Sequence, residues 1–99
     1  MSSYTWYKLV DKKPMIDETN GAWFKLNKHL LKLAHTKITK EIEVITIFLS
    51  LSAENEPKLF ETSVNGRHAP NILMRFATYD EALRGHEAIC NEVRFLLNI

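Results

Sequence analysis

Residue types that bind metal ions are present in this chain, but their spacing does not predict a metal site. There are four histidines and one cysteine, Cys90. His86 and Cys90 lie four residues apart, which places them on one face of a helix, and the pattern around them predicts that this face is buried. Zinc sites instead combine several such ligands at short, characteristic spacings. We therefore expect no metal and no cofactor, and we interpret His86 as a packed histidine.

Two charged residues in otherwise apolar segments are the main candidates for a binding site. Glu61 and Arg75 lie in segments rich in leucine, phenylalanine and methionine. A structural interpretation is that they meet across paired strands as a salt bridge, because a buried charge needs a partner. A functional interpretation is that Arg75 binds an anionic ligand and Glu61 orients it. Thr62 and His86 would complete such a pocket.

Catalysis has little support in the sequence. Ser50, Ser52 and Ser63 lack the surroundings of a nucleophile elbow, and three glycines do not form a recognisable phosphate-binding loop. We therefore expect that the protein is not an enzyme. One alternative stays open, an unfamiliar active site around His86 and Glu61, which would require a pH-dependent activity.

A locally basic segment raises the question of nucleic acid binding. The chain has no acidic residue between Glu18 and Glu41, and bases could stack on Trp23 or Phe24. However, lysines spaced along an apolar stripe are typical of a solvated face, and the formal net charge of the chain is only +1. We expect no nucleic acid partner. The lysines of this segment are Lys25, Lys28, Lys32, Lys37 and Lys40.

The composition is that of one small globular domain. Of the 99 residues, 45% are apolar and 25% are charged, so we expect one hydrophobic core and a single domain over residues 1–99. One cysteine indicates a reducing compartment, and the start of the chain has no signal-peptide pattern. The longest apolar stretch without a charge, residues 44–53, is about half of what a membrane span needs. We expect a cytoplasmic protein without a membrane partner.

The N-terminal half predicts a strand, a turn, a helix and a second strand. Residues 4–10 alternate aromatic and polar side chains, and Pro14 ends the turn that follows. From Asp17 onward, capping residues and apolar residues three and four apart predict a helix that ends near Lys28. We favour a strand over residues 29–36, where a continued helix also fits the pattern.

Three further strands are predicted in the middle of the chain. Residues 42–52 are rich in β-branched residues and have apolar side chains on both faces, so this strand belongs in the middle of a sheet. Residues 58–64 resume strand character before the turn signal Asn65-Gly66, and residues 72–77 alternate again. The short connections predict that these three strands are antiparallel.

A long helix is predicted at the C-terminus. Thr78 and Glu81 have the spacing of a capping box. Gly85 inside the helix costs about 1 kcal/mol relative to alanine, which indicates close backbone packing or a nearby ligand. The elements together predict an α+β fold, an antiparallel sheet of about four to five strands with two helices, the longer one C-terminal. The predicted buried stripe consists of Ala82, His86, Ile89, Val93 and Leu96.

The central strand also suggests a dimer. It has apolar residues on both faces, and two helices leave one face of the sheet under-covered. A homodimer would hide that surface. We expect a homodimer with a ligand pocket at its interface, lined by Trp6, Trp23, Arg75 or His86.

Three segments of the chain resemble a family of small phage and prophage proteins of uncharacterised function. The resemblance covers most of residues 42–86, with a weaker similarity at Trp23-Phe24. Members of that family carry an Asp-His pair after the central strand, where this chain has Ser52-Ala53. The segments are residues 46–51 (TIFLSL), residues 57–66 (PKLFETSVNG), and residues 75–82 (RFATYDEA) followed by Gly85-His86.

The resemblance implies a phage accessory protein rather than a housekeeping enzyme, and it does not supply a function. By analogy with small phage proteins that lack catalytic motifs, we expect it to act by stoichiometric binding in the host cytoplasm. Our hypothesis is a role in host takeover or counter-defence, in which the protein sequesters a small anionic or nucleotide-like ligand or a host defence protein. One alternative is a structural or assembly protein of the virion, and the other is the unfamiliar enzyme. The predicted ligand-binding residues are Arg75, Glu61, Thr62, His86 and Trp23.

Overall fold

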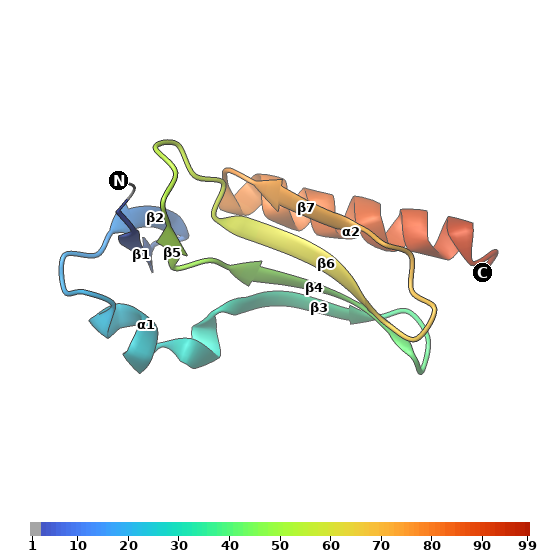
Figure 1. Ribbon diagram of the computed structural model, residues 1–99. Helices are drawn as coiled ribbons and strands as arrows, with labels where there is room; N and C mark the ends of the chain where they lie inside the picture. Colours follow the sequence, from blue (N-terminus) through green and yellow to red (C-terminus); the bar gives the residue numbers. More distant parts are fainter. Residues whose placement is uncertain (1–2) are drawn as a thin grey trace.

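The larger of two antiparallel sheets forms the body of the protein (Figure 1). The structure is a computed structural model and describes residues 3–99. In the central strand every second residue from Ile42 to Phe48 is buried, because one face of a strand packs against the core. The strand order is β3-β4-β6-β7. These strands are β3 (Lys32–Lys37), β4 (Ile42–Phe48), β6 (Phe60–Gly66) and β7 (Leu73–Phe76).

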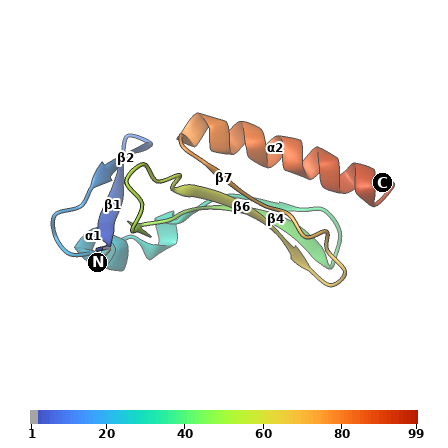
Figure 2. The ribbon, with the colours of Figure 1, turned by 45° about the horizontal axis from the view of Figure 1, so that its top comes forward.

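Helix α2 (Tyr79–Leu96) covers one face of this sheet. Figure 2 shows that no helix of the described residues covers the opposite face. The Thr78 hydroxyl accepts a hydrogen bond from the Glu81 N–H at 3.1 Å, so the predicted N-terminal cap is confirmed. Gly85 packs directly on the ring of Phe76, where a Cβ atom would lie well inside van der Waals contact. The glycine therefore reflects close packing of helix on sheet.

The smaller sheet lies at one end of the larger one (Figure 1) and has the order β2-β1-β5. Asp11 and Lys12 form the β1–β2 turn, with left-handed φ angles of 49° and 69°. The β4–β5 segment joins the two sheets, and the Tyr7 N–H donates to the Ser50 carbonyl at 2.7 Å at this junction. The strands are β1 (Thr5–Val10), β2 (Lys13–Ile16) and β5 (Leu51–Ser52).

A short helical segment, α1 (Ala22–Leu26) followed by the 3-10 turn η1 (Lys28–Leu30), connects the two sheets. Asp17 anchors its start, because its carboxylate accepts hydrogen bonds from the Thr19 hydroxyl at 2.5 Å, the Thr19 N–H at 3.0 Å and the Trp23 N–H at 3.3 Å. The bond from the Thr19 hydroxyl is the main cause that lowers the pKa of Asp17, although burial acts in the opposite direction.

The hydrophobic core between α2 and the sheet consists of two clusters. One lies toward the C-terminal end of α2, and the other is rich in aromatic rings, with Phe48 and Phe60 at 5.6 Å between ring centroids. The first cluster contains Ile42, Val44, Ile89, Cys90 and Val93. The second contains Phe48, Leu59, Phe60 and Ala82.

The predicted α+β class with the longer helix at the C-terminus is confirmed, and so is a strand within residues 29–36. The prediction of one continuous strand over residues 42–52 is wrong. The chain leaves β4 after Phe48 because β5 pairs with β1 in the other sheet. The predicted turn extends to Pro14, but in the structure Pro14 already lies in β2. Proline is tolerated there because β2 is an edge strand, where the missing N–H removes no hydrogen bond between strands.

Three smaller expectations also differ from the structure. The helix from Asp17 is reduced to α1, and Asn65-Gly66 lies in β6, paired with β4, rather than in a turn. Leu96 is 53% exposed, whereas Leu97 packs on the core. Within residues 3–99, no helix has the length and apolar character needed to cross a membrane.

Candidate functional site

A chain of four hydrogen-bonded side chains lies between α2 and the four-stranded sheet. The Thr36 hydroxyl contacts His86 Nε2 at 2.9 Å, and His86 Nδ1 contacts the Thr46 hydroxyl at 2.7 Å. Thr46 also contacts the Thr62 hydroxyl at 2.5 Å. Thr46 and Thr62 are fully buried and His86 is 3% exposed. This buried network therefore satisfies its polar atoms inside the protein.

The buried network separates the two hydrophobic clusters. Thr46 lies on β4 between Val44 and Phe48, which belong to different clusters. A neutral imidazole has one donor and one acceptor nitrogen, so His86 can bond both threonines in either tautomer. Sliding of α2 along the sheet would break these bonds in a low-dielectric interior, so the network fixes the position of the helix.

The environment of His86 favours its neutral form. Burial lowers the pKa of His86 below its ordinary value of 6.5, because the charged imidazolium would lose its hydration. The Glu87 carboxylate acts in the opposite direction, and His35 acts in the same direction as burial. His86 is therefore a neutral hydrogen-bonding residue at physiological pH, and its burial agrees with the interpretation of a packed histidine.

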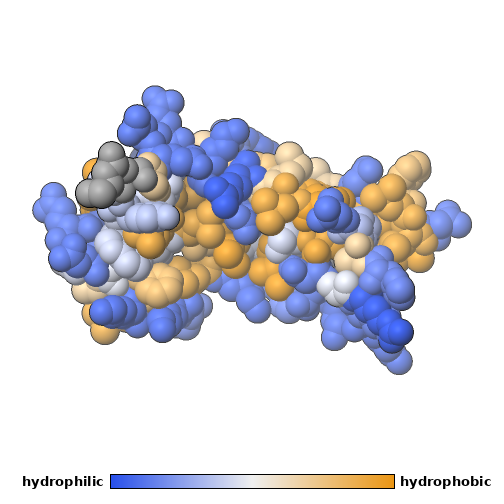
Figure 3. Space-filling view, in the orientation of Figure 1, coloured by the Kyte–Doolittle hydropathy of each residue, from blue (hydrophilic) through white to orange (hydrophobic). Residues whose placement is uncertain are grey.

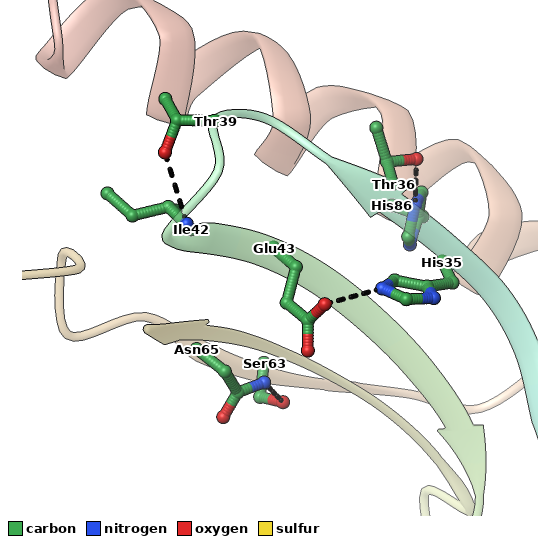
Figure 4. Close-up of polar contacts among 8 residues, drawn as sticks. All are labelled: His35, Thr36, Thr39, Ile42, Glu43, Ser63, Asn65 and His86. Carbon is green, nitrogen blue, oxygen red and sulfur yellow. Dashed lines mark hydrogen bonds and ion pairs between the residues drawn. The ribbon is translucent and has the colours of Figure 1, made fainter. Parts of the chain in front are cut away.

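Neighbouring residues of β3 point to opposite faces of the sheet (Figure 4). Thr36 points toward His86, whereas His35 Nε2 lies 2.7 Å from the Glu43 carboxylate on β4. The side chains of His35 and Glu43 are 40% and 35% exposed. Solvent-exposed pairs of this kind contribute about 1 kcal/mol at most. This pair therefore belongs to the surface, and the buried network belongs to the core.

The predicted salt bridge between Glu61 and Arg75 is present across β6 and β7. Arg75 Nε donates to Glu61 Oε2 at 3.0 Å, and the two residues are register partners. Because side chains alternate along a strand, Glu61 lies on the open face, opposite its neighbour Thr62. The structure thus separates the predicted site residues, with Glu61 and Arg75 on one face of the sheet and Thr62 and His86 on the other.

A different site is present where the two sheets meet, and we call it the junction cavity. Its volume is about 510 Å³, within the range of about 300 to 1,000 Å³ that is typical of small-molecule sites. The end of β4, the segment into β5, and parts of β1, α1, η1 and β3 surround it. The lining residues are Trp6, Phe24, Lys28, Leu31, Lys32, Ile47, Phe48, Leu49, Ser50 and Leu51.

Two aromatic side chains contribute to the wall of the junction cavity. The rings of Trp6 and Phe24 lie 5.6 Å apart at an interplanar angle of 48°. Gly21 allows the chain to approach this indole, because its φ is +87° and a Cβ atom would lie 2.8 Å from the Trp6 ring. Trp23, the aromatic residue predicted to bind ligand, does not line the cavity. Its ring packs edge-on against Phe48 at 5.8 Å.

Two lysines carry the charge of the junction cavity. Lys28 Nζ lies 5.6 Å from the centroid of the Phe24 ring, a cation–π contact. Lys32 begins β3, where it pairs with Ile47. Over residues 3–99, neither ammonium forms a salt bridge and no acidic residue lines the cavity. The local potential is therefore positive and favours an anionic ligand.

Ser50 is the unusual residue of the lining. It is 4% exposed, and its Oγ is the one buried side-chain oxygen or nitrogen in the described chain that lacks a hydrogen-bond partner. Its backbone is held in place, because its carbonyl accepts the Tyr7 N–H and the adjacent Leu49 N–H donates to the Leu59 carbonyl, both at 2.7 Å. A buried hydroxyl without a partner costs about 1 to 3 kcal/mol.

Sequence reasoning does not find the junction cavity. From the sequence, Ser50 is a weak candidate nucleophile, and Lys28 and Lys32 are surface lysines. One usable signal is the position of Ser50, a hydroxyl at a core-facing position in the apolar alternation of residues 42–52. The cavity itself depends on how the two sheets meet, which no local pattern encodes.

Comparisons of the chain with family models, curated proteins and solved structures give no match. The resemblance to small phage proteins therefore stays a prediction. The chemistry of the site has to be inferred from its own residues.

Proposed function

We propose that this protein is a non-enzymatic binding protein that sequesters a small anionic ligand in the junction cavity. The observation that carries this proposal is the junction cavity itself, whose lining is largely apolar, carries Lys28 and Lys32, and includes no acidic residue of the described chain. A small ligand that combines a negative charge with apolar surface would match this lining.

The lining favours binding over catalysis. The two lysines are the only titratable residues of the described chain that line the junction cavity. No carboxylate or histidine is therefore placed there to activate Ser50 as a nucleophile. His86 already has both ring nitrogens engaged in the buried network. The alternative enzyme around His86 and Glu61 has less support, because these residues lie on opposite faces of the sheet.

The biological role that we propose is that of a phage accessory protein acting in host takeover or counter-defence. The resemblance within residues 42–86 supports this role. Stoichiometric removal of a nucleotide-derived signal, or of another small anion, from the host cytoplasm would require a binding cavity and no catalytic group. A host defence protein is the alternative partner.

We also propose that the open face of the four-stranded sheet joins a second copy of the chain. Ile45 and Ile47 lie on this face of β4, and Leu73 of β7 is 59% exposed. Figure 3 views the face obliquely and shows hydrophobic residues over the strands. A dimer would cover this surface. Sedimentation velocity should show a dimer that Ile45→Lys dissociates, whereas a larger assembly would favour the virion alternative.

Native mass spectrometry tests the binding proposal. The protein is expressed in cells with active nucleotide-signalling defence, and its mass is measured before and after denaturation. We expect an added small-molecule mass that is released unchanged. A chemically converted product would contradict sequestration.

A matched pair of variants locates the ligand. Lys28→Glu with Lys32→Glu should abolish the added mass, because it reverses the charge of the junction cavity. Lys37→Glu with Lys40→Glu changes the net charge equally on the same basic segment but outside the cavity, and it should retain the ligand. Loss of the added mass in both variants would show that binding depends on the overall charge of the protein and not on the junction cavity.

A further inference from the structure

Resting on the proposed function, we infer that the junction cavity binds a monoanionic amphipath, namely a carboxylate on a predominantly hydrocarbon body. This inference names the ligand class, which the positive potential alone leaves open between carboxylates and nucleotides. It depends on three properties of the lining: its apolar surface, its few neutral hydrogen-bonding groups, and the position of its two charges.

The first property is the apolar surface. Three aliphatic residues spaced two apart, Ile47, Leu49 and Leu51, line the cavity together with the aromatic pair Trp6 and Phe24. Leu51 is 40% exposed, so a hydrocarbon ligand would remove apolar surface of the protein as well as its own from water. Each methylene buried in this way tightens binding about fourfold.

The second property is the scarcity of neutral polar side chains. Besides the lysines, the lining residues have only two side-chain hydrogen-bonding groups, the Trp6 indole N–H and the Ser50 hydroxyl, and the Ser50 Oγ is buried. A nucleobase has several donors and acceptors along its edges, and each one that is buried without a partner weakens binding about tenfold. The hydrocarbon body of an amphipath has no such atoms.

The third property is the arrangement of charge. Lys28 on η1 and Lys32 at the start of β3 are four residues apart, and both side chains are on exposed residues. Exposed ammonium–carboxylate pairs are screened by solvent and contribute little each. The lysines therefore select the sign of the head group, and the apolar body supplies most of the affinity. A ligand with one carboxylate head group and a hydrocarbon body matches this arrangement of charge and apolar surface.

A homologous series of ligands tests the inference. Dissociation constants are measured by protein-observed NMR titration for hexanoate, octanoate and decanoate below their micelle-forming concentrations, and for decan-1-ol and adenosine monophosphate. We expect binding to tighten about fourfold per methylene, and decanoate to bind several-fold tighter than decan-1-ol. Adenosine monophosphate should bind more weakly than octanoate.

Variants separate the head group from the body. Lys28→Gln with Lys32→Gln should remove the preference for decanoate over decan-1-ol and leave the gain per methylene unchanged, because the apolar wall is intact. Lys37→Gln with Lys40→Gln should change neither quantity. A gain per methylene that persists without any effect of the cavity lysines would overturn the assignment of the head group.

Two other outcomes distinguish this inference from the function on which it rests. Tight binding of adenosine monophosphate with no binding of the carboxylates would overturn the amphipath and leave sequestration standing. Absence of binding by every probe, together with no added mass in the native spectrum, would overturn both.

Discussion

Thr46 and Ser50 lie four residues apart, and both carry buried hydroxyls, yet these hydroxyls have opposite surroundings. Thr46 is fully buried and contacts both Thr62 and His86. Ser50 is 4% exposed, and its Oγ has no partner within residues 3–99. The first hydroxyl lies in the interface between helix and sheet, and the second is buried at the junction of the two sheets, in a residue that borders the junction cavity.

The difference separates a polar group that the fold needs from one that the fold tolerates. Removing a hydroxyl that bridges two buried partners leaves those partners unsatisfied, whereas removing a hydroxyl without a partner removes a cost. We therefore assign the buried network to stability, and the Ser50 hydroxyl has no such role. Each prediction below tests one side of this assignment.

The largest expected effect is on Thr46. Thr46→Val keeps the shape of the side chain but leaves the Thr62 hydroxyl and His86 Nδ1 without their shared partner, so the free energy of unfolding should fall by about 3 kcal/mol. Urea denaturation measures this change. Thr46→Val combined with Thr62→Val should cost less than the sum of the single variants, because the two hydroxyls are coupled. Strict additivity would show that they act independently.

A smaller effect is expected at Gly85, which allows the helix to come close enough for His86 to reach the sheet. Gly85→Ala should destabilise the protein by about 1 to 2 kcal/mol, because the new methyl group would collide with Phe76. Ala88→Gly, at an exposed position of the same helix, gives the intrinsic cost of glycine, about 1 kcal/mol. If Gly85→Ala raised the stability, the close packing would be refuted.

A pH dependence should also come from the buried network. The pKa of His86 is lowered in the folded state, so the unfolded chain binds a proton first as the pH falls. The stabilisation that neutral His86 provides is complete above its unfolded pKa of 6.5 and decreases as the pH falls below that value toward the folded pKa. His86→Gln should flatten this part of the curve of unfolding free energy against pH, and an unchanged curve would assign the titration to other groups.

The smallest effect on stability is expected for Ser50. Ser50→Ala should leave the free energy of unfolding within about 0.5 kcal/mol of the wild-type value or raise it, because no hydrogen bond is lost. Ser52→Ala, two residues further along the same segment, is the comparison variant, because it removes a hydroxyl that accepts a hydrogen bond from the Glu54 N–H at 3.1 Å. A loss as large as that of Thr46→Val would mean that Ser50 has a structural partner after all.

The parts of the fold that local patterns encode are predictable from the sequence. The Thr78 cap, the buried helix stripe through His86, and the pairing of Glu61 with Arg75 follow from spacing and alternation. The division into two sheets does not, because the break after Phe48 depends on pairing between β5 and the distant strand β1. The junction cavity lies where the two sheets meet, so it could not be predicted from the sequence either.

The most direct test of the comparison is an amide NMR titration of the wild-type protein with decanoate. The central claim predicts shift changes at Trp6, Phe24, Lys32 and Ser50, which line the junction cavity, and unchanged positions for Thr46 and His86 in the buried network. Shift changes at the buried network, or at Ile45 and Leu73 on the open face outside the cavity, with none at Trp6 and Phe24, would contradict the claim.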